Sequence, residues 1–496
     1  MTQDPGGDRA GEVGARERVD VLVVGAGFAG LGAALRLARR GRESFVVLER
    51  GDDVGGTWRD NTYPGVASDV PAHLYSFSFA PRSDWSRVFA PGAEIQDYLR
   101  ACGREVAAHV RLRTEVRRAR WDEDELRWHV ETTRGRFSAG VLVLAAGRLT
   151  EPRIPDLPGL ADFDGPVFHT SRWEHGVDLT RLRVAVVGTG ASAVQVLPRL
   201  AGSVRGLTVF QRSAPYVVPR DDAAYSPRQR AEFARAPERA RELREQIFID
   251  LEQGVGARRA VPHLVEAFRH RALEHLRRQV GDPVLRAALT PDYEVGCKRV
   301  LLSDEFYPAL QRPGVELVPA ALQRFEGSTA VAGDGSRREV DAVVLATGFH
   351  ASEQPYAHLV LGRAGRTLAQ EWAGGMVSHA STVVHGFPNA FVLDGPNASL
   401  GHNSAVHVIE SQLGYLVGAL DHLALTGSPL EVSAAAQLAY TDDIDRMAQD
   451  SVWVRGGCTN WYVDPRNGRL TLLWPDTAAA FRERNGTFDP QPFVTG

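Results

Sequence analysis

The stretch VDVLVVGAGFAGLGAALRLARRG, residues 19–41, decides the fold that we expect for this chain. An apolar run typical of a buried strand leads into glycines, and a pattern with helical spacing follows. Gly25, Gly27 and Gly30 form G-x-G-x-x-G between the two. The first glycine permits a tight turn, the second lets the backbone approach a pyrophosphate, and the third lets the helix pack on the strand. The stretch therefore predicts a dinucleotide-binding unit.

The next strand, FVVLER (residues 45–50), has near its end an acidic residue that can recognise a ribose. Glu49 lies 24 residues after Gly25, where a carboxylate accepts hydrogen bonds from a ribose diol. A glycine turn with this acidic residue is more specific than the turn alone.

The pattern restarts at Arg183 with RVAVVGTGASAVQVLPRLA, in which Gly188, Gly190 and Ala193 form G-x-G-x-x-A. Its second strand, LTVFQR, ends in Arg212 where the first unit has an acid. A guanidinium pairs with a 2′-phosphate, which an acid would repel, so NADPH is preferred over NADH. An ordinary surface arginine is the alternative. The two opposite ribose readers together predict FAD in the first unit and NADPH in the second.

The order of the elements predicts an α/β fold with two Rossmann-like domains, the second inserted in the first. We expect a disordered tail over 1–18, an FAD-binding domain in two parts, 19–150 and 335–496, and an NADP-binding domain over 151–334 with a helical insertion over about 221–292. A later helical run, VIESQLGYLVGALDHLAL, belongs to the second part.

Composition excludes several classes of protein. The chain has 496 residues and a net charge of −4, which gives no electrostatic reason to expect nucleic acid or an anionic membrane as a partner. The sequence contains no long uncharged apolar run, so we expect no membrane-spanning helix. The three cysteines, Cys102, Cys297 and Cys458, form no C-x-x-C pair, so we expect neither a disulfide nor dithiol chemistry. This absence favours a reducing compartment, and we expect a cytoplasmic location.

Between the two units, FDGPVFHTSRWEH places Phe163, Gly165, His169 and Trp173 at the spacing F-x-G-x-x-x-H-x-x-x-W. This fingerprint resembles that of the Baeyer-Villiger monooxygenases, the ketone-oxygenating branch of the class B flavoprotein monooxygenases. Glu174 and His175 depart from the Pro and Asp or Gly that usually follow. The related N- and S-oxygenating enzymes usually have Tyr or Phe followed by Lys there, so Trp173 favours the Baeyer-Villiger branch.

Four further segments resemble the same family: 55–79, 296–310, 395–412 and 458–475. The resemblance implies that the active-site Arg is Arg299, that Asp69 holds it, and that Lys298 reaches the 2′-phosphate together with Arg212. We also expect His402 and Asn403 in loops of the flavin-binding domain, with a purely structural role as the alternative. The FAD-binding residues that we expect are Gly25, Gly27, Phe28, Ala29, Gly30, Glu49, Thr57, Trp58, Asp60, Asp69, Tyr75 and Val116. Those for NADP are Gly188, Thr189, Gly190, Ala191, Ser192, Ala193, Arg212, Ser213, Lys298 and Arg299.

The expected chemistry gives Arg299 and Asp69 defined roles. Reduced flavin and O2 yield a C4a-peroxyflavin, and its attack on a ketone creates a second anion. A guanidinium keeps its proton near neutral pH and can stabilise both anions, while a carboxylate holds it in place. A loop-capping role is the alternative for Asp69. The products are an ester or lactone and water.

Lys298 is the only lysine among the 57 basic residues of the chain. A compact ammonium on a flexible stem fits where a planar guanidinium does not, so Lys298 has a candidate role at the 2′-phosphate. Chance survival in an arginine-rich composition is the alternative.

Two other functions stay open at the level of sequence: S- or N-oxygenation of a soft nucleophile, and a flavin-binding protein without oxygenase activity. A disulfide reductase is disfavoured because C-x-x-C is missing. Without H-E-x-x-H or another ligand pattern, we expect no metal. The sequence indicates neither the particular ketone nor the oligomeric state.

Overall fold

The first glycine turn joins strand β1 (Glu17–Val24) to helix α1 (Phe28–Arg39) in the computed structural model, which describes residues 16–494. At Gly25 the backbone has φ +101°, and a Cβ there would lie 2.5 Å from the carbonyl oxygen of Ala145. Only glycine combines this conformation with so close an approach. The turn thus brings the start of α1 against the end of a neighbouring strand.

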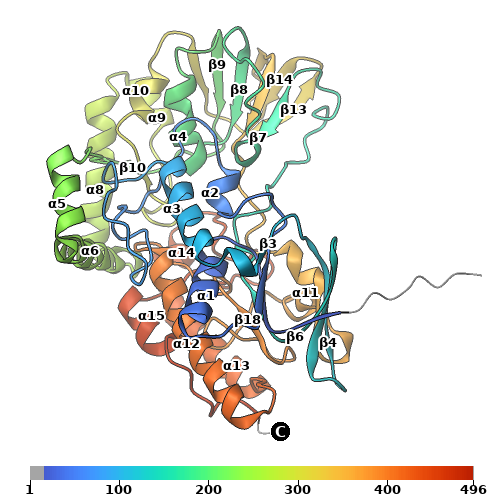
Figure 1. Cartoon of the computed structure of the whole chain (residues 1–496). Coiled ribbons are helices and arrows are strands. Elements are labelled where there is room, and N and C mark those ends of the chain that lie inside the picture. The colour runs from blue at the N-terminus through green and yellow to red at the C-terminus, as the bar shows by residue number, and fades with distance from the viewer. Residues whose placement is uncertain (1–15, 495–496) are drawn as a thin grey trace, which may run out of the picture.

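The first sheet combines segments from both ends of the chain (Figure 1). Strands β1, β2 and β3 lie parallel on one side, and β4, β5 and β6 form an antiparallel meander on the other. The order is β17 (Val360–Leu361), β4 (Val116–Asp122), β5 (Arg127–Thr132), β6 (Gly135–Leu144), β1, β2 (Phe45–Leu48), β3 (Val110–Arg111), with β18 (Ala390–Val392) also paired to β6. Because β17 and β18 come from the second part of the domain, one sheet unites the two parts.

The expected boundary of the N-terminal tail is wrong at its inner end. Strand β1 begins at Glu17, and Glu17 and Arg18 pair in register with Phe137 and Ser138 of β6. Backbone pairing extends a strand without requiring apolar side chains, so the polar residues before Val19 concealed its start. The rest of the expected tail, residues 1–15, lies outside the described residues.

The second sheet is parallel, in the order β12 (Val315–Val318), β9 (Gly206–Phe210), β8 (Arg183–Val187), β16 (Ala342–Leu345), β7 (Val167–His169). Beside it, β13 (Leu322–Glu326), β14 (Thr329–Ala332) and β15 (Arg337–Glu339) form an antiparallel sheet. Strand β16 pairs with β8 and β7 in this sheet. The boundary expected after residue 334 is therefore wrong, because the apolar run of β16 does not by itself reveal which sheet it joins.

Five helices lie between the two halves of the second domain in the sequence. They are α5 (Pro227–Arg235), α6 (Pro237–Glu252), α7 (Val255–Arg258), α8 (Pro262–Gln279) and α9 (Pro283–Ala288). Helices α5, α6 and α8 of this helical layer are at the left of Figure 1. Glu252, the last residue of α6, accepts hydrogen bonds from His402 and Asn403 in the loop before α12 and from the amide of Ala478. Burial opposes ionisation of Glu252, but these donors outweigh it and lower its pKa to about 2. An ionised carboxylate thus anchors the helical layer to the FAD-binding domain.

The C-terminal helices close the lower part of the molecule (Figure 1): α12 (Ala405–Thr426), α13 (Ala434–Ala448), α14 (Val452–Arg455) and α15 (Ala478–Asn485). Helix α12 packs on α1 in one apolar core, in which Leu35 and Leu413 are almost fully buried. The other helices are α2 (Thr57–Asp60), α3 (Gly92–Glu105), α4 (Ala191–Leu200), α10 (Phe306–Leu310) and α11 (Leu368–Glu371). Within residues 16–494, none of the helices has the length and apolar character needed to cross a bilayer.

Cys297 and Cys458 form a disulfide, so the expectation of no disulfide is wrong. The two residues are 161 positions apart in the sequence, but the fold brings their Cα atoms to 6.2 Å. Cys102 remains free and buried. Motif spacing detects only cysteines that are near in sequence, and this pair is joined by tertiary structure. We expected a reducing, cytoplasmic compartment because we expected no disulfide, and this disulfide removes that reason.

Candidate active site

A cavity of about 470 Å³ follows the first glycine turn. Most of the residues that we expected to bind FAD line it: Gly25, Gly27, Phe28, Ala29, Glu49, Thr57, Trp58, Asp60, Tyr75 and Val116. Gly30 and Asp69 are not part of its wall. A Cβ at Gly30 would lie 1.8 Å from the carbonyl oxygen of Gly25, so Gly30 serves the packing of the turn.

Glu49 is buried at one end of this cavity, directly after β2. Its carboxylate accepts hydrogen bonds from the amides of Ala26 (2.9 Å) and Gly51 (2.7 Å) and pairs with Arg59 at 2.6 Å. These contacts fix the carboxylate beside the start of α1. This is the position that a ribose reader requires, and its contact with a ribose stays a prediction.

Aromatic side chains line another part of the cavity. Tyr75 packs edge-on against Phe28 and Trp58, with ring centroids 5.1 and 5.5 Å apart. Burial raises the pKa of Tyr75 to about 12, so its phenol stays protonated near neutral pH. A rigid apolar wall of this kind suits a planar ring system.

The second glycine turn is more open than the first. Gly188 has φ +108°, and a Cβ there would lie 2.6 Å from the carbonyl oxygen of Ala346. Gly190 and Ala191, at the start of α4, are exposed, and Arg212 is exposed beyond β9. Thr189 donates to the carbonyl oxygen of Ser213 at 3.2 Å, which joins the turn to the segment that carries Arg212.

Lys298 lies beside this segment because strand β10 (Val217–Val218) pairs with β11 (Leu301–Leu302). Its Nζ donates to the hydroxyl of Ser213 at 2.7 Å and lies 4.8 Å from the ring centroid of Tyr293. Burial, and then the positive charge of Arg212, lowers the pKa of Lys298. A lysine that lies within the electrostatic influence of an arginine forms with it a site suited to an anion.

Arg299 joins the two domains through Asp69. Its Nε and Nη2 approach the same carboxylate oxygen at 2.7 and 2.5 Å, and each side chain is about one-third exposed. Asp69 raises the pKa of Arg299, burial opposes this, and Tyr462 adds to the rise. Arg299 therefore remains charged at any physiological pH.

The loop that carries Asp69 is held by the second domain. Gln195 of α4 donates to the carbonyl oxygen of Ala67 at 3.0 Å, and Arg220 donates to that of Ser68 at 2.9 Å. The partner of Arg299 is thus positioned by residues of the domain that carries Arg299.

The fingerprint residues lie around the two connections between the domains. His169 ends β7 and caps the following turn, with its Nδ1 accepting from the amide of Ser171 at 3.1 Å. Burial lowers the pKa of His169 to about 4, so its imidazole is neutral near pH 7. Its ring lies against Phe349 of the returning connection, with centroids 5.4 Å apart. This placement indicates a role in domain geometry.

The other fingerprint side chains also pack. Phe163 lies 5.2 Å from the ring of Phe325, Trp173 lies 5.0 Å from that of Phe168, and a Cβ at Gly165 would meet the carbonyl oxygen of Asp341 at 2.2 Å. Glu174 and His175, where the sequence departs from the fingerprint, are exposed. The departure therefore leaves this packing unaffected.

Sequence reasoning missed three polar residues of this region: Arg148, Asp394 and Tyr462. Arg148 and Asp394 line the cavity beside the first glycine turn, and Tyr462 affects the pKa of Arg299. Arg148 follows β6, the neighbour of β1, and the carboxyl ends of adjacent parallel strands meet at one edge. That rule was the available signal for Arg148. No comparable signal marks Tyr462, which comes from a loop.

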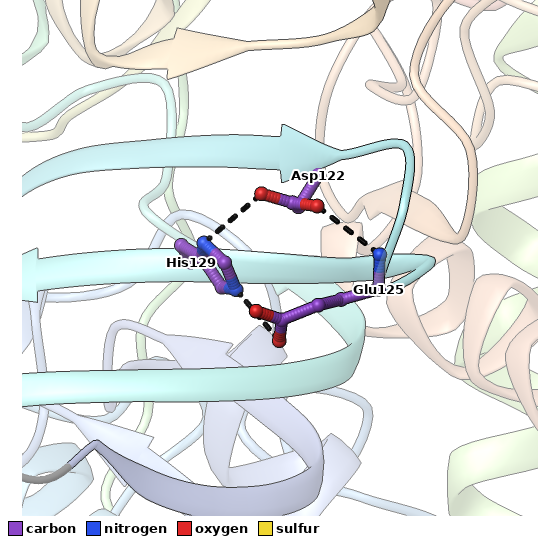
Figure 2. A group of neighbouring side chains, drawn as sticks. All are labelled: Asp122, Glu125 and His129. Atoms are coloured by element: carbon purple, nitrogen blue, oxygen red, sulfur yellow. Dashed lines mark hydrogen bonds and ion pairs between the residues drawn. The ribbon is translucent and has the colours of Figure 1, made fainter.

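One trio among residues 16–494, Asp122, Glu125 and His129, brings three possible metal-ligand atoms within 4.8 Å (Figure 2). The imidazole lies between the two carboxylates, with Nδ1 3.5 Å from Asp122 and Nε2 3.0 Å from Glu125. Arg120 pairs with Asp122 at 3.0 Å, and Arg16 lies 3.6 Å from Glu125. Because the two nitrogens face different carboxylates and guanidiniums balance the charge, the trio is an ion-pair network of the β4–β5 hairpin. We assign no metal to it.

Comparison with known proteins agrees with this geometry. The family model described as pyridine nucleotide-disulphide oxidoreductase matches residues 22–249. A Baeyer-Villiger monooxygenase of Streptomyces coelicolor is 45% identical over 477 residues, covering 95% of this chain and 92% of the relative. The closed crystal structure of cyclohexanone monooxygenase superposes with a TM-score of 0.85 at 27% identity, covering 95% and 97% of the two chains. OTEMO in complex with FAD and NADP gives 0.85 at 26% identity, with coverage of 95% and 97%.

A doubly Rossmann-like fold with an arginine at the junction of its two domains defines a flavoprotein monooxygenase of class B. Within that class, the chain belongs to the Baeyer-Villiger monooxygenases, which are NADPH-dependent flavin enzymes. The fold class and the family expected from the sequence are both confirmed.

Proposed function

We propose that this chain binds FAD in the cavity beside the first glycine turn and NADPH at the second, and oxygenates a ketone with O2. One oxygen atom of O2 enters beside the carbonyl carbon to give an ester or lactone. The other leaves as water, with two electrons and a proton from NADPH and a second proton from solvent. The observation that carries the proposal is the Arg299–Asp69 pair, which joins the two cofactor-binding domains.

The residues of the cavity fit FAD. Its wall combines the amide-bearing start of α1, the fixed carboxylate of Glu49 and the aromatic side chains of Phe28, Trp58 and Tyr75. Bound FAD supplies the chemistry, since it accepts a hydride from NADPH and activates O2 for transfer to the substrate. The protein orients the ring and limits the access of water.

The residues of the second turn fit NADPH. The exposed start of α4 offers amides to the pyrophosphate, and Arg212, Ser213 and Lys298 form a cationic group for the 2′-phosphate. The effect of Arg212 on Lys298 supports this assignment: after burial, the positive charge of Arg212 lowers the pKa of Lys298, and a bound phosphate would oppose that effect.

Arg299 stabilises negative charge during the transfer. Its guanidinium keeps its proton and can donate to an oxygen that becomes anionic at the substrate carbonyl. Asp69 orients the guanidinium and balances its charge before that anion forms. Gln195 and Arg220 of the second domain donate hydrogen bonds to the loop that carries Asp69. The position of Arg299 is therefore linked to the arrangement of the two domains.

Product analysis tests the proposal. Purified holoenzyme with NADPH and ¹⁸O2 is given cyclic, aryl and linear ketones, with a thioether as a competing substrate. We expect esters or lactones that contain one labelled oxygen atom. Sulfoxide as the sole product would instead support S-oxygenation, and hydrogen peroxide as the sole product of every substrate would contradict monooxygenation.

A further inference from the structure

Arg148 and Asp394 form an ion pair in the wall of the FAD cavity. Their side chains are only 11% and 16% exposed. The register explains the pair, because Val392 of β18 lies opposite Leu144 of β6, and both chains continue from there into the cavity wall. The amide of Asp394 donates to Gln412 of α12 at 2.9 Å, which fixes the carboxylate on this side.

The pair shares the cavity wall with the aromatic side chains of Phe28, Trp58 and Tyr75. The pKa of Arg148 is lowered to about 10, mainly by burial and also by the positive charge of Arg299. Tyr75 and Tyr462 act in the opposite direction and raise it. Arg148 therefore interacts electrostatically with Tyr75 of the cavity wall and with the active-site Arg299. A planar ring system held against these aromatic side chains would lie in the same cavity as the guanidinium of Arg148.

The guanidinium of Arg148 has an N–H group without a hydrogen-bond partner among residues 16–494. This group is at Nε, which is buried. Asp394 balances the charge but contacts Nη1, so a donor remains for a group inside the cavity. A buried donor without a partner is costly, and a ligand acceptor would satisfy it.

We propose that Arg148 tunes bound FAD by favouring negative charge on the flavin ring, and that Asp394 sets the strength of this effect. Hydride transfer breaks a C–H bond of NADPH, forms an N–H bond on the flavin and moves two electrons, so NADPH becomes NADP⁺ and the ring gains a negative charge. A nearby guanidinium lowers the free energy of that charged state. Asp394 neutralises Arg148 while the ring is still oxidised and uncharged.

This inference rests on the proposed assignment of the cavity to FAD. It concerns Arg148 as a positioning and tuning residue, and it predicts opposite effects for the two partners of one ion pair. A purely structural role predicts effects of the same sign, because loss of either partner would loosen the same wall. The sign therefore separates the two interpretations.

The experiment measures the two-electron midpoint potential of the bound flavin in the holoenzyme and in Arg148→Gln, Arg148→Lys and Asp394→Asn. We expect Arg148→Gln to shift the equilibrium about tenfold toward oxidised flavin, which lowers the potential by about 30 mV for a two-electron couple. Asp394→Asn should shift it toward reduced flavin. Arg148→Lys should restore most of the parental value because it keeps the charge.

The matched control is Arg363→Gln, since Arg363 pairs with Glu431 and Glu123 and is not part of the cavity wall. Its potential should equal that of the parent. FAD content is measured first for every protein. A parental protein that cannot bind FAD would contradict the proposed function itself. Bound FAD with unchanged potentials, or with shifts of the same sign in Arg148→Gln and Asp394→Asn, would overturn only this inference.

Discussion

The two glycine turns share a backbone conformation and differ in their surroundings. Gly25 and Gly188 have φ +101° and +108°, and each approaches a carbonyl oxygen at the end of a neighbouring strand. At the first turn, Phe28 and Ala29 are buried, whereas Gly190 and Ala191 at the second are exposed. The enclosed turn suits a cofactor that stays bound, and the open turn suits one that exchanges.

Tertiary packing produces this difference. Helix α12 and the loop around Phe77 pack so closely on α1 that a Cβ at Gly32 would lie 2.8 Å from Leu413 and 3.0 Å from Phe77. At the turns themselves the contrast is smaller: a Cβ at Gly27 would lie 3.8 Å from the Cα of Gly56, whereas in the described part of the chain nothing lies within 4 Å of a Cβ at Gly190, the corresponding residue. A similar glycine motif thus performs two tasks because different segments cover it.

The largest expected effect comes from Arg299, which lies between the domain with the enclosed turn (the enclosed half) and the domain with the open turn (the open half). In Arg299→Ala, ester formation should fall by roughly 100- to 1,000-fold, because the developing anion loses its charged donor. FAD should remain bound and reducible by NADPH, as checked by anaerobic bleaching. Near-parental ester formation would remove Arg299 from the mechanism.

Glu49→Ala should affect only the enclosed half. Loss of the carboxylate removes the acceptor of the Ala26 amide and the proposed contact with the ribose, while Arg59 keeps Asp60 as a partner, so the dissociation constant of FAD should rise about 10- to 100-fold. The KM for NADPH of the reconstituted enzyme should stay unchanged. Equilibrium dialysis measures the FAD affinity, and the exposed Glu43→Ala is the matched control. Unchanged FAD affinity would contradict the assigned role.

Arg212→Ala should affect only the open half. The KM for NADPH should rise about tenfold or more, since a charge-assisted contact with the 2′-phosphate is lost. NADH lacks this phosphate, so its KM in the same variant is the internal control and should change little. Equal losses with both cofactors would indicate a structural role for Arg212.

A smaller effect is expected for Lys298→Arg, which keeps the charge and changes only the shape of the cation. The ammonium of Lys298 fits between Ser213 and Tyr293, and a planar guanidinium should displace the 2′-phosphate. Use of NADPH should be about 3- to 10-fold poorer, with more hydrogen peroxide released per NADPH oxidised. Unchanged values for both quantities would make Lys298 dispensable.

The smallest effect on catalysis is expected from the Cys297–Cys458 disulfide, which ties the segment before Lys298 to the C-terminal part of the FAD-binding domain. Its reduction should raise the KM for NADPH about twofold and lower the free energy of unfolding by about 2–4 kcal/mol, while FAD affinity is unchanged. Thermal unfolding with and without dithiothreitol measures this. Cys297→Ser/Cys458→Ser should not respond to the reductant, and an equal response in that variant would exclude the disulfide as the cause.

Much of the site was predictable because its motifs are local. The Gly25 and Gly188 turns, Glu49 and Arg212 lie within short strand–turn–helix units, and the structure places them as the spacing predicts. Arg299 and Asp69 are 230 positions apart, and only the family resemblance brought them together before the fold showed the pair. The boundary near β16 and the start of β1 were wrong because strand pairing, and not local pattern, decides them.

By itself, the sequence determined the two dinucleotide-binding units and, through its resemblance, the family, since these depend on residue types at fixed short spacings; the roles of Glu49 and Arg212 at the riboses stay predictions. Only the tertiary structure decided which turn is enclosed, that Arg148 faces Asp394, that Tyr462 approaches Arg299, and that Cys297 meets Cys458. The physical reason is that these contacts join residues far apart in the chain. Sheet register and domain packing set such distances, and no local periodicity encodes them.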